Sequence, residues 1–207
     1  MKKFAIGCGV LVVLGIIALV IIAICGLSYN HLVKLQQGAD SQWAQVQNVY
    51  QRRADLVPNL VATVSGAANF EKSTLVEITQ ARASVGQIKI DPNHAPADSA
   101  TLAQFEQAQS GLSSALSRLL VVSERYPDLK ANANFQELQA QLEGTENRIA
   151  TERGRFNDAV QAYDTAIKSF PDVLYAGAYG FKEKPYFTAT TGADKPPQVQ
   201  FDFNSNK

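Results

Sequence analysis

An apolar run near the N-terminus restricts the fold of this chain more than any other feature. The 24 residues from Phe4 to Leu27 include no Asp, Glu, Lys, Arg or His, and fifteen of them are Leu, Ile, Val or Phe. A helix rises about 1.5 Å per residue, so the run is roughly 36 Å long and exceeds a hydrocarbon core of about 30 Å. It therefore predicts a single-pass transmembrane helix over residues 4–27, preceded by a short head of residues 1–3.

A cleaved signal peptide is the competing interpretation of this run, with cleavage after Cys25 or Gly26. The apolar region of a signal peptide is normally about 7–15 residues long, which is shorter than this run. A lipoprotein site at Cys25 is less favoured still, because Ile24 stands where such sites usually have a small residue. We therefore expect the run to be retained as an anchor in the lipid bilayer.

The charges on either side of the run indicate its orientation. Lys2, Lys3 and the terminal amine precede it, whereas the fifteen residues after it contain one lysine, Lys34, and the opposing Asp40. Positively charged residues beside a membrane helix favour the cytoplasmic side. We expect a cytoplasmic N-terminus and a helical domain in the periplasm or outside the cell.

Composition excludes several kinds of function. The chain carries 19 Lys and Arg against 19 Asp and Glu, so no excess of positive charge draws it to nucleic acid. Its two cysteines, Cys8 and Cys25, both lie in the apolar run. The remainder consequently offers neither a disulfide scaffold nor a Cys-ligated zinc or iron–sulfur site.

The sequence after the run has the period of long amphipathic helices. From Tyr29 to Val64 apolar residues recur in steps of mostly three and four, which is the pattern of one stripe on a helix of about forty residues. Only Gly26 and residues 28–30 separate this stripe from the apolar run, so the two can join with little interruption. Pro58 lies inside the stripe, and we expect a kink or a break into two helices there.

Three further helices are predicted over residues 71–85, 99–125 and 131–168. A loop over residues 86–99 with two prolines separates the first two of these, and Asp98 or Ser99 offers an N-cap. No segment with the period of a strand occurs before residue 172. The predicted fold class is all-α, an antiparallel four-helix bundle of long, coiled-coil-like helices over residues 28–171.

The composition changes over residues 172–207, which are rich in Gly, Pro and aromatic residues. A freely solvated tail is rarely so aromatic. We expect this segment to lie across the bundle as extended chain, with one short strand over residues 198–203 and disorder in the last few residues.

Residue types that most enzymes and metal sites need are scarce. His31 and His94 are the only histidines, so neither a His-rich metal site nor a Ser–His–Asp or Cys–His arrangement is expected. No Gly-rich phosphate loop follows a strand, and Glu143, Glu146 and Glu152 lack the E-x-x-H spacing of di-iron sites. We expect no catalytic residue, no metal and no cofactor, with a carboxylate-only site as the remaining catalytic alternative.

Polar residues interrupt the apolar stripe on two of the expected helices, at Arg53 on the first and at Glu146 and Glu152 on the last. One interpretation is that these charges flank the core and pair along the helix, as Glu152 and Arg155 would. The other is a polar layer across the bundle, with Arg53 paired to Glu146 or Glu152, or a ligand site in the same place. The candidate structural or interaction residues are Arg52, Arg53, Asp55, Pro58, Asn59, Glu146, Asn147, Arg148, Glu152 and Arg153.

Two of the helical segments are distinctive: residues 51–61 read QRRADLVPNLV, and residues 145–150 read TENRIA. With Trp43–Val46, the Phe170–Pro171 pair and the PPQVQF of residues 196–201, they resemble the LemA family of bacterial membrane proteins. The resemblance covers about residues 28–203 in the family's order. Phe156 departs from it, where Tyr is common in the family.

The resemblance implies an N-terminal membrane anchor followed by a helical domain, and no established activity. One branch of the family is linked to building magnetosome membranes, and members are often encoded near membrane metalloproteases of the heat-shock type. By analogy we expect a non-catalytic helical scaffold of the bacterial inner membrane, accessory to membrane biogenesis or protein quality control. Its expected partners are other envelope proteins, including a membrane protease, and a homo-oligomer is compatible with this role.

The alternative is an extracytoplasmic sensor that binds a small ligand between its helices and acts through a membrane partner. Arg52, Arg53 and Asp55 near Pro58 are the candidate ligands in that case.

Overall fold

The computed structural model describes residues 2–66, 70–88, 90–91 and 93–188. This part of the chain forms five α-helices and one 3-10 helix without any strand, which confirms the all-α prediction. The strand and the disorder expected near the C-terminus lie outside the described residues. The elements are α1 (Lys2–Ser65), α2 (Lys72–Gln87), α3 (Ser99–Ser123), α4 (Pro127–Lys130), α5 (Ala133–Lys168) and η1 (Asp172–Leu174).

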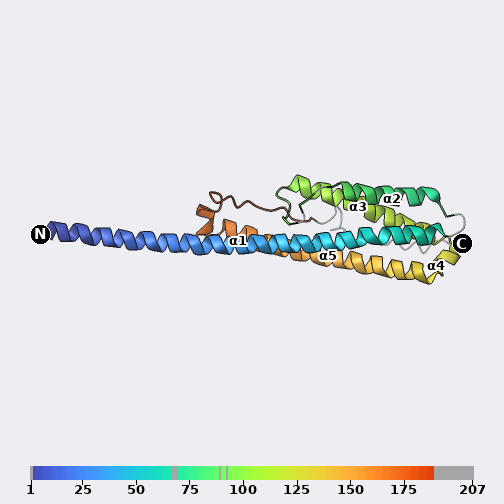
Figure 1. The fold of residues 1–207 in the computed structure, drawn as a ribbon, viewed down its shortest axis with the longest axis horizontal. Coiled ribbons are helices and arrows are strands. Elements are labelled where there is room, and N and C mark those ends of the chain that lie inside the picture. The colour runs from blue at the N-terminus through green and yellow to red at the C-terminus, as the bar shows by residue number, and fades with distance from the viewer. Residues whose placement is uncertain (1, 67–69, 89, 92, 189–207) are drawn as a thin grey trace, which may run out of the picture.

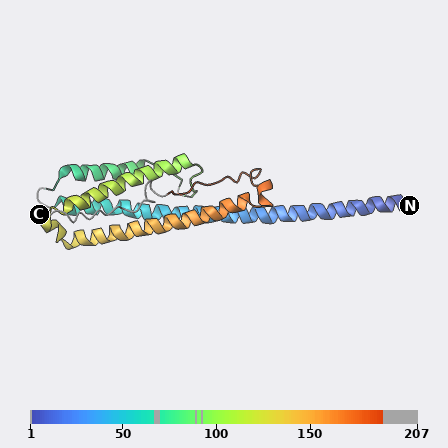
Figure 2. The same cartoon turned by 180° about the vertical axis from the view of Figure 1, so that it is seen from behind.

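α1 is one unbroken helix of 64 residues, about 96 Å long at the usual rise. Its N-terminal part projects alone beyond the other helices, and its C-terminal part belongs to the bundle (Figures 1 and 2). The apolar side chains described between Leu11 and Leu27 are mostly exposed to the surroundings. Among the described residues, α1 is the one helix that is long enough and apolar enough to cross a membrane.

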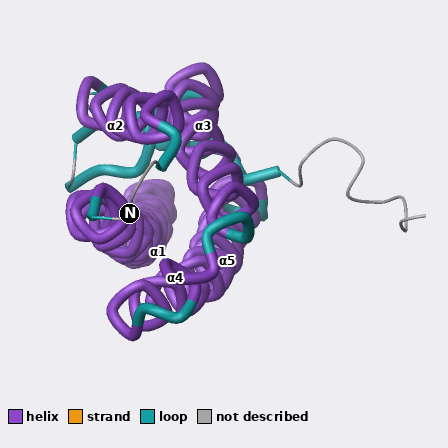
Figure 3. Tube along the Cα trace, turned by 90° about the vertical axis from the view of Figure 1, so that its right-hand side faces the viewer, coloured by secondary structure: helices purple, strands orange, loops and turns teal. Residues whose placement is uncertain are grey.

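Four long helices form the bundle and run alternately in opposite directions (Figure 1). α1 packs chiefly against α5, and α2 packs against α3. Viewed along the bundle, α2 and α3 lie side by side above α1, and α5 lies beside α1 (Figure 3). The antiparallel order suits the connections, because even the longest of them, residues 88–98 between α2 and α3, is compatible with a return beside the helix that the chain has just left.

The boundaries differ from the sequence prediction near the turns. The third helix ends at Ser123, and a short helix, α4, begins at Pro127, where proline at the first helical position leaves no unmet donor. Asn132 caps α5 by accepting from the backbone N–H groups of Asn134 and Phe135. Residues 172–174 form the 3-10 turn η1, although extended chain was expected there.

The buried core divides into three clusters along the bundle. The cluster farthest from the N-terminus is aliphatic around Leu60, Ile78 and Leu119. The middle cluster is aromatic: the buried ring of Trp43 lies 5.2 Å from the ring of Phe105, between centroids, and contacts other aromatic rings at similar distances. The cluster nearest the projecting part of α1 surrounds Leu32, Tyr163 and Phe181. Rings of this size bury large apolar areas and dominate the energetics of such a core.

A kink or a break was expected at Pro58; α1 continues through this residue, so the break into two helices is wrong. Pro58 has no N–H to donate to the carbonyl oxygen of Ala54, the acceptor four residues earlier in the helix. Nε of Arg82, on α2, donates to this oxygen instead, at 2.9 Å. A side chain of the neighbouring helix thus satisfies the carbonyl that proline leaves without its usual donor, and the helix reaches Ser65.

After η1 the chain turns back along the bundle. Gly180 adopts a positive φ of 82° at this turn, a conformation that glycine takes without steric cost. Residues 181–188, which we term the C-terminal strap, then run beside the helices without regular secondary structure (Figure 1). The rings of Phe181 and Phe187 are buried in the core, so the strap completes two of the three clusters.

Candidate functional site

Arg53 is the centre of the candidate site. It lies on the buried face of α1, one helical turn after Tyr50, and 1% of its side chain is exposed. Nη1 donates to Oγ of Ser113 at 2.5 Å and to Oε1 of Glu146 at 2.7 Å. Nη2 donates to the side-chain Oε1 of Gln109 at 2.6 Å and to its backbone oxygen at 3.1 Å. We term these four residues, Arg53, Gln109, Ser113 and Glu146, the Arg53 layer.

The Arg53 layer joins three helices, because Gln109 and Ser113 belong to α3 and Glu146 to α5. Both terminal nitrogens of the guanidinium are engaged, whereas Nε has no hydrogen-bond partner among the described residues. The guanidinium carbon lies 5.1 Å from the centre of the Tyr50 ring, within the range of a cation–π contact. The layer therefore fixes one helix against two others at a single depth of the bundle.

Three of the four acceptors around this buried cation are neutral. The Glu146 side chain is 46% exposed, so water screens its attraction to Arg53. Gln109 is buried and supplies two acceptors. Moving a cation out of water costs several kcal/mol, which such contacts offset rather than exceed. The layer is accordingly better suited to setting the register of the helices than to adding stability.

The structure separates the predicted site residues into two groups. Of the two pairings considered for Arg53, the structure has the one with Glu146, while Glu152 pairs with Arg155 at 2.8 Å along α5. Neighbouring residues on a helix point about 100° apart, so those next to Arg53 and Glu146 do not share their direction. The predicted residues that are exposed and stay outside the layer are Arg52, Asp55, Pro58, Asn59, Asn147 and Arg148.

Arg153 forms a second polar contact, two turns after Glu146 on α5. Its Nη2 donates to Oε1 of Glu106 at 2.7 Å and to the backbone oxygen of Thr188 at 3.1 Å. Its guanidinium carbon lies 4.5 Å from the centre of the Phe187 ring. Burial raises the pKa of the Glu106 carboxyl, and the charge of Arg153 opposes this rise. Arg153 therefore links α5, α3 and the C-terminal strap.

Residues that the sequence analysis did not single out hold the C-terminal strap. Asn157 exchanges two hydrogen bonds of 2.9 Å with the backbone of Phe187. Nζ of Lys184 donates to Oδ1 of the buried Asp40 at 3.1 Å, and its backbone N–H donates to Oδ1 of Asp164 at 3.2 Å. Asp40 and Asp164 lie beside apolar positions of long helices. A carboxylate at such a position is a candidate for burial, and a buried carboxylate needs a partner. This pattern is the sequence signal that could have identified Asp40 and Asp164.

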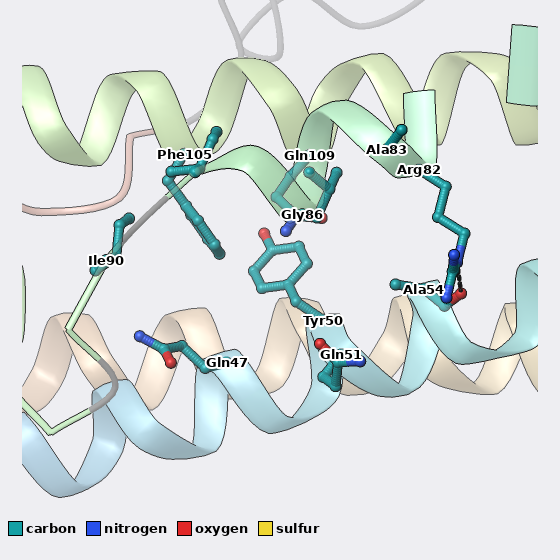
Figure 4. Close-up of a pocket in the computed structure, with 12 residues that line it drawn as sticks. Gln47, Tyr50, Gln51, Ala54, Arg82, Ala83, Gly86, Ile90, Phe105 and Gln109 are labelled. Atoms are coloured by element: carbon teal, nitrogen blue, oxygen red, sulfur yellow. Dashed lines mark hydrogen bonds between the residues drawn. The ribbon is translucent and has the colours of Figure 1, made fainter. Parts of the chain in front are cut away.

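Two cavities lie on either side of the Arg53 layer. One of about 350 Å³ lies among α1, α2 and α3, where Tyr50 points from α1 toward Gln109 and Arg82 reaches from α2 to Ala54 (Figure 4). The other, of about 470 Å³, lies between α3 and α5 beside Glu146. Both volumes fall in the range of small-molecule sites.

The chemistry available at the layer is hydrogen bonding. Burial raises the pKa of the Tyr50 hydroxyl, with Arg153 and Arg53 opposing the rise, so the group stays neutral at pH 7. The described residues include no group of three or more His, Cys, Asp or Glu side chains that could hold a metal ion. The layer can therefore orient helices or bind a polar molecule.

One family model and several known proteins match this chain. The model of the LemA family matches residues 42–201. Magnetosome protein MamQ of Magnetospirillum gryphiswaldense is 26% identical over 198 residues, which cover 84% of this chain and 70% of MamQ. MamQ 2 of Paramagnetospirillum magneticum is 26% identical over 205 residues, covering 90% of this chain and 74% of the relative. Protein LemA of Metamycoplasma hominis is 24% identical over 141 residues, covering 68% and 60%.

Proposed function

Because this chain belongs to the LemA family, we propose that it is a membrane-anchored helical scaffold that binds other proteins of the bacterial cell envelope. The chain is a membrane-associated protein with one apolar N-terminal helix. The single observation that carries the proposal is the continuity of α1 from the apolar stretch into the bundle. An unbroken helix holds the bundle at a fixed distance from the bilayer, which suits contact with neighbouring membrane proteins.

The use of the buried polar groups supports a binding role. Arg53 is engaged by Gln109, Ser113 and Glu146, and Arg153 is engaged by Glu106 and the strap. These groups bind parts of the same chain, so we assign them to positioning the helices. The outer faces of the bundle are then left for partners.

The names of the relatives suggest the setting. Two of them are named magnetosome proteins, which supports an accessory role in building or maintaining membranes. A role beside a membrane protease in protein quality control is the second form of this proposal. We place the anchor in the inner membrane, with the N-terminus in the cytoplasm, because Lys2 and Lys3 precede the apolar run. Proteinase added to intact and to broken cells tests this orientation.

Photo-crosslinking of the full chain in cells tests the binding role. The crosslinker is placed at Val121, an exposed apolar residue of α3, and in a matched variant at Ile78, which is buried. We expect reproducible adducts with particular envelope proteins, or with a second copy, from position 121 only. The proposal is contradicted if a folded, membrane-inserted chain gives no protein adduct there, or the same adducts from both positions.

A ligand sensor is the second candidate function, and the cavity of about 350 Å³ beside Tyr50 favours it. Arg52 and Asp55, the ligands expected for this role, are exposed, and Gln109, Ser113 and Glu146 engage Arg53. A ligand would instead meet Tyr50, Gln109 and Arg82. Thermal unfolding in the presence of envelope metabolites tests this role, since a bound ligand raises the midpoint and a screen without any rise argues against it.

A further inference from the structure

Large apolar side chains are exposed where the bundle meets the projecting part of α1. They belong to residues 170–179, which we term the membrane-proximal segment and which includes η1. Phe170 is 80% exposed and Leu174 is 73% exposed, and Val173 and Tyr179 are about half exposed. Adjoining apolar side chains that remain outside a protein core are unfavourable in water and usually mark a contact surface.

The membrane-proximal segment is fixed to α1 just after the apolar stretch. The rings of Tyr29 and Tyr179 lie 5.3 Å apart, between centroids, and those of Tyr175 and Tyr179 lie 5.7 Å apart. Tyr175 also lies beside Cys25 and Ser28. Its hydroxyl donates to Oδ1 of Asp172 at 2.5 Å. These contacts hold η1 at the level where α1 leaves the bundle (Figures 1 and 2).

The apolar surface of the anchor continues directly onto this segment. A wide groove of about 610 Å³ is lined by Ile21, Ile22 and Cys25 from the apolar stretch and by Tyr29 and Tyr179 beyond it. The lipid-facing surface of the anchor therefore continues without a break to Tyr179 of the segment.

The depth along α1 places the segment in the headgroup layer. Leu27 ends the apolar run, and Tyr29 follows two residues later, about 3 Å farther along the helix axis. The headgroup layer on each side of the hydrocarbon core is about 5–7 Å thick. Tyrosine concentrates at this depth, because its ring is apolar and its hydroxyl is polar. The segment, held against residues 25–29, lies at the same level.

We propose that residues 170–179 insert into the headgroup layer of the bilayer that α1 spans, with Phe170 and Leu174 reaching the acyl chains. The occupant of this patch is lipid. The contact gives the bundle a second attachment to the membrane, about 140 residues after the first in sequence, and sets the tilt of the bundle over the bilayer surface. It rests on the part of the proposed function in which α1 spans the membrane.

Quenching of tryptophan emission by brominated acyl chains tests this contact. The full-length variants are reconstituted in phosphatidylcholine vesicles without bromine, or with bromine at the depth of each reporter: near the headgroup end of the acyl chains for Phe170→Trp and Val121→Trp, and near their methyl end for Ile17→Trp. Ile17→Trp, in the anchor, reports on insertion of α1. Val121→Trp is the matched control, because Val121 is 71% exposed and lies at the far end of the bundle. The native Trp43 is buried and gives the background, and circular dichroism verifies the helix content of each variant.

We expect the brominated lipid to reduce the emission of Phe170→Trp and of Ile17→Trp and to leave Val121→Trp unchanged. Quenching of Ile17→Trp without quenching of Phe170→Trp overturns this inference and leaves the anchor in place. It also points to a protein as the cover of the patch. Quenching of neither contradicts both the inference and the anchor, and equal quenching at residues 121 and 170 overturns the inference.

Discussion

Asn157 and Phe187 exchange two hydrogen bonds: Nδ2 of Asn157 donates to the backbone oxygen of Phe187, and the backbone N–H of Phe187 donates to Oδ1 of Asn157, each at 2.9 Å. The amide of Asn157 thus acts as the edge of a strand for one residue of the C-terminal strap. The Phe187 ring packs against the rings of Trp43 and Phe156 at the same time. The two hydrogen bonds and the buried ring therefore both attach the strap to the helices.

Replacing Asn157 should loosen the strap. Asn157→Ala leaves a partly buried N–H and a carbonyl of Phe187 without partners, which costs about 1–3 kcal/mol. We expect the free energy of unfolding of the full chain in detergent micelles to fall by that amount, and hydrogen exchange to accelerate in residues 181–188. Asn147→Ala is the control on the same helix, because Asn147 is exposed and exposed substitutions usually change stability by less than about 0.5 kcal/mol. Equal effects of the two variants would contradict the role given to Asn157.

Arg82 and Pro58 should be coupled energetically through Ala54. In Pro58→Ala an amide N–H returns to the position from which α1 normally bonds the carbonyl oxygen of Ala54. Arg82→Ala should cost about 1 kcal/mol in the native chain, because the hydrogen bond at 2.9 Å is lost. The same change should cost less in the Pro58→Ala background. A double-mutant cycle measures the difference.

The control for this cycle is Arg118→Ala, which removes an exposed arginine that pairs with Glu77 on α2. Its effect should be small and the same in both backgrounds. If Arg82→Ala has the same cost with and without Pro58, the account of the unbroken helix is wrong.

The two charges of the Arg53 layer should contribute unequally to stability. Arg53→Ala empties a buried site and leaves the buried Gln109 without its donor, so we expect a loss of about 2–4 kcal/mol. Glu146→Ala should cost about 1 kcal/mol or less, because Glu146 is half exposed and Ser113 and Gln109 still accept from Arg53. Arg52→Ala, at an exposed position, is the control. Similar losses for Arg53→Ala and Glu146→Ala would show that the ion pair, rather than the neutral acceptors, stabilises the layer.

The half-buried carboxyl of Glu106 should make the free energy of unfolding depend on pH. Burial raises its pKa above the ordinary value of 4.5, so the folded chain retains a proton that the unfolded chain releases. The contribution to the free energy of unfolding is present below pH 4.5 and is lost as the pH rises above that value toward the folded-state pKa. Glu106→Gln cannot ionise, so its stability should fall less steeply over this range. Denaturation midpoints measured across a pH series provide the comparison, and parallel curves would contradict the prediction.

The helices could be predicted because their signal is local. The steps of three and four between Tyr29 and Val64 report which face of one helix is buried, and no distant partner is needed to read them. This stripe indicated Arg53 as an exception, and the stripe of the last helix indicated Glu146 as one of its two possible partners. It could not choose between Glu146 and Glu152, because the choice depends on the register of α5 against α1.

The contacts that depend on tertiary packing were missed. The continuity of α1 through Pro58 depends on Arg82, 28 residues later on another helix. The C-terminal strap depends on Lys184 meeting Asp40, which is 144 residues earlier. Periodicity within one segment has no information on such pairs, and propensity at Pro58 was overridden by a donor from outside the helix.

The continuity of α1 between the bilayer and the bundle is the central claim, and a distance between two spin labels tests it most directly. The labels are placed at Leu19→Cys and Gln37→Cys, two exposed positions on one face, in a chain whose Cys8 and Cys25 are replaced by alanine and which is reconstituted in vesicles. An unbroken helix of 18 residues separates the two backbones by about 27 Å, and we predict a single narrow distribution near that value. A broad distribution, or one centred at a clearly shorter distance, would contradict the claim by showing a hinge between anchor and bundle.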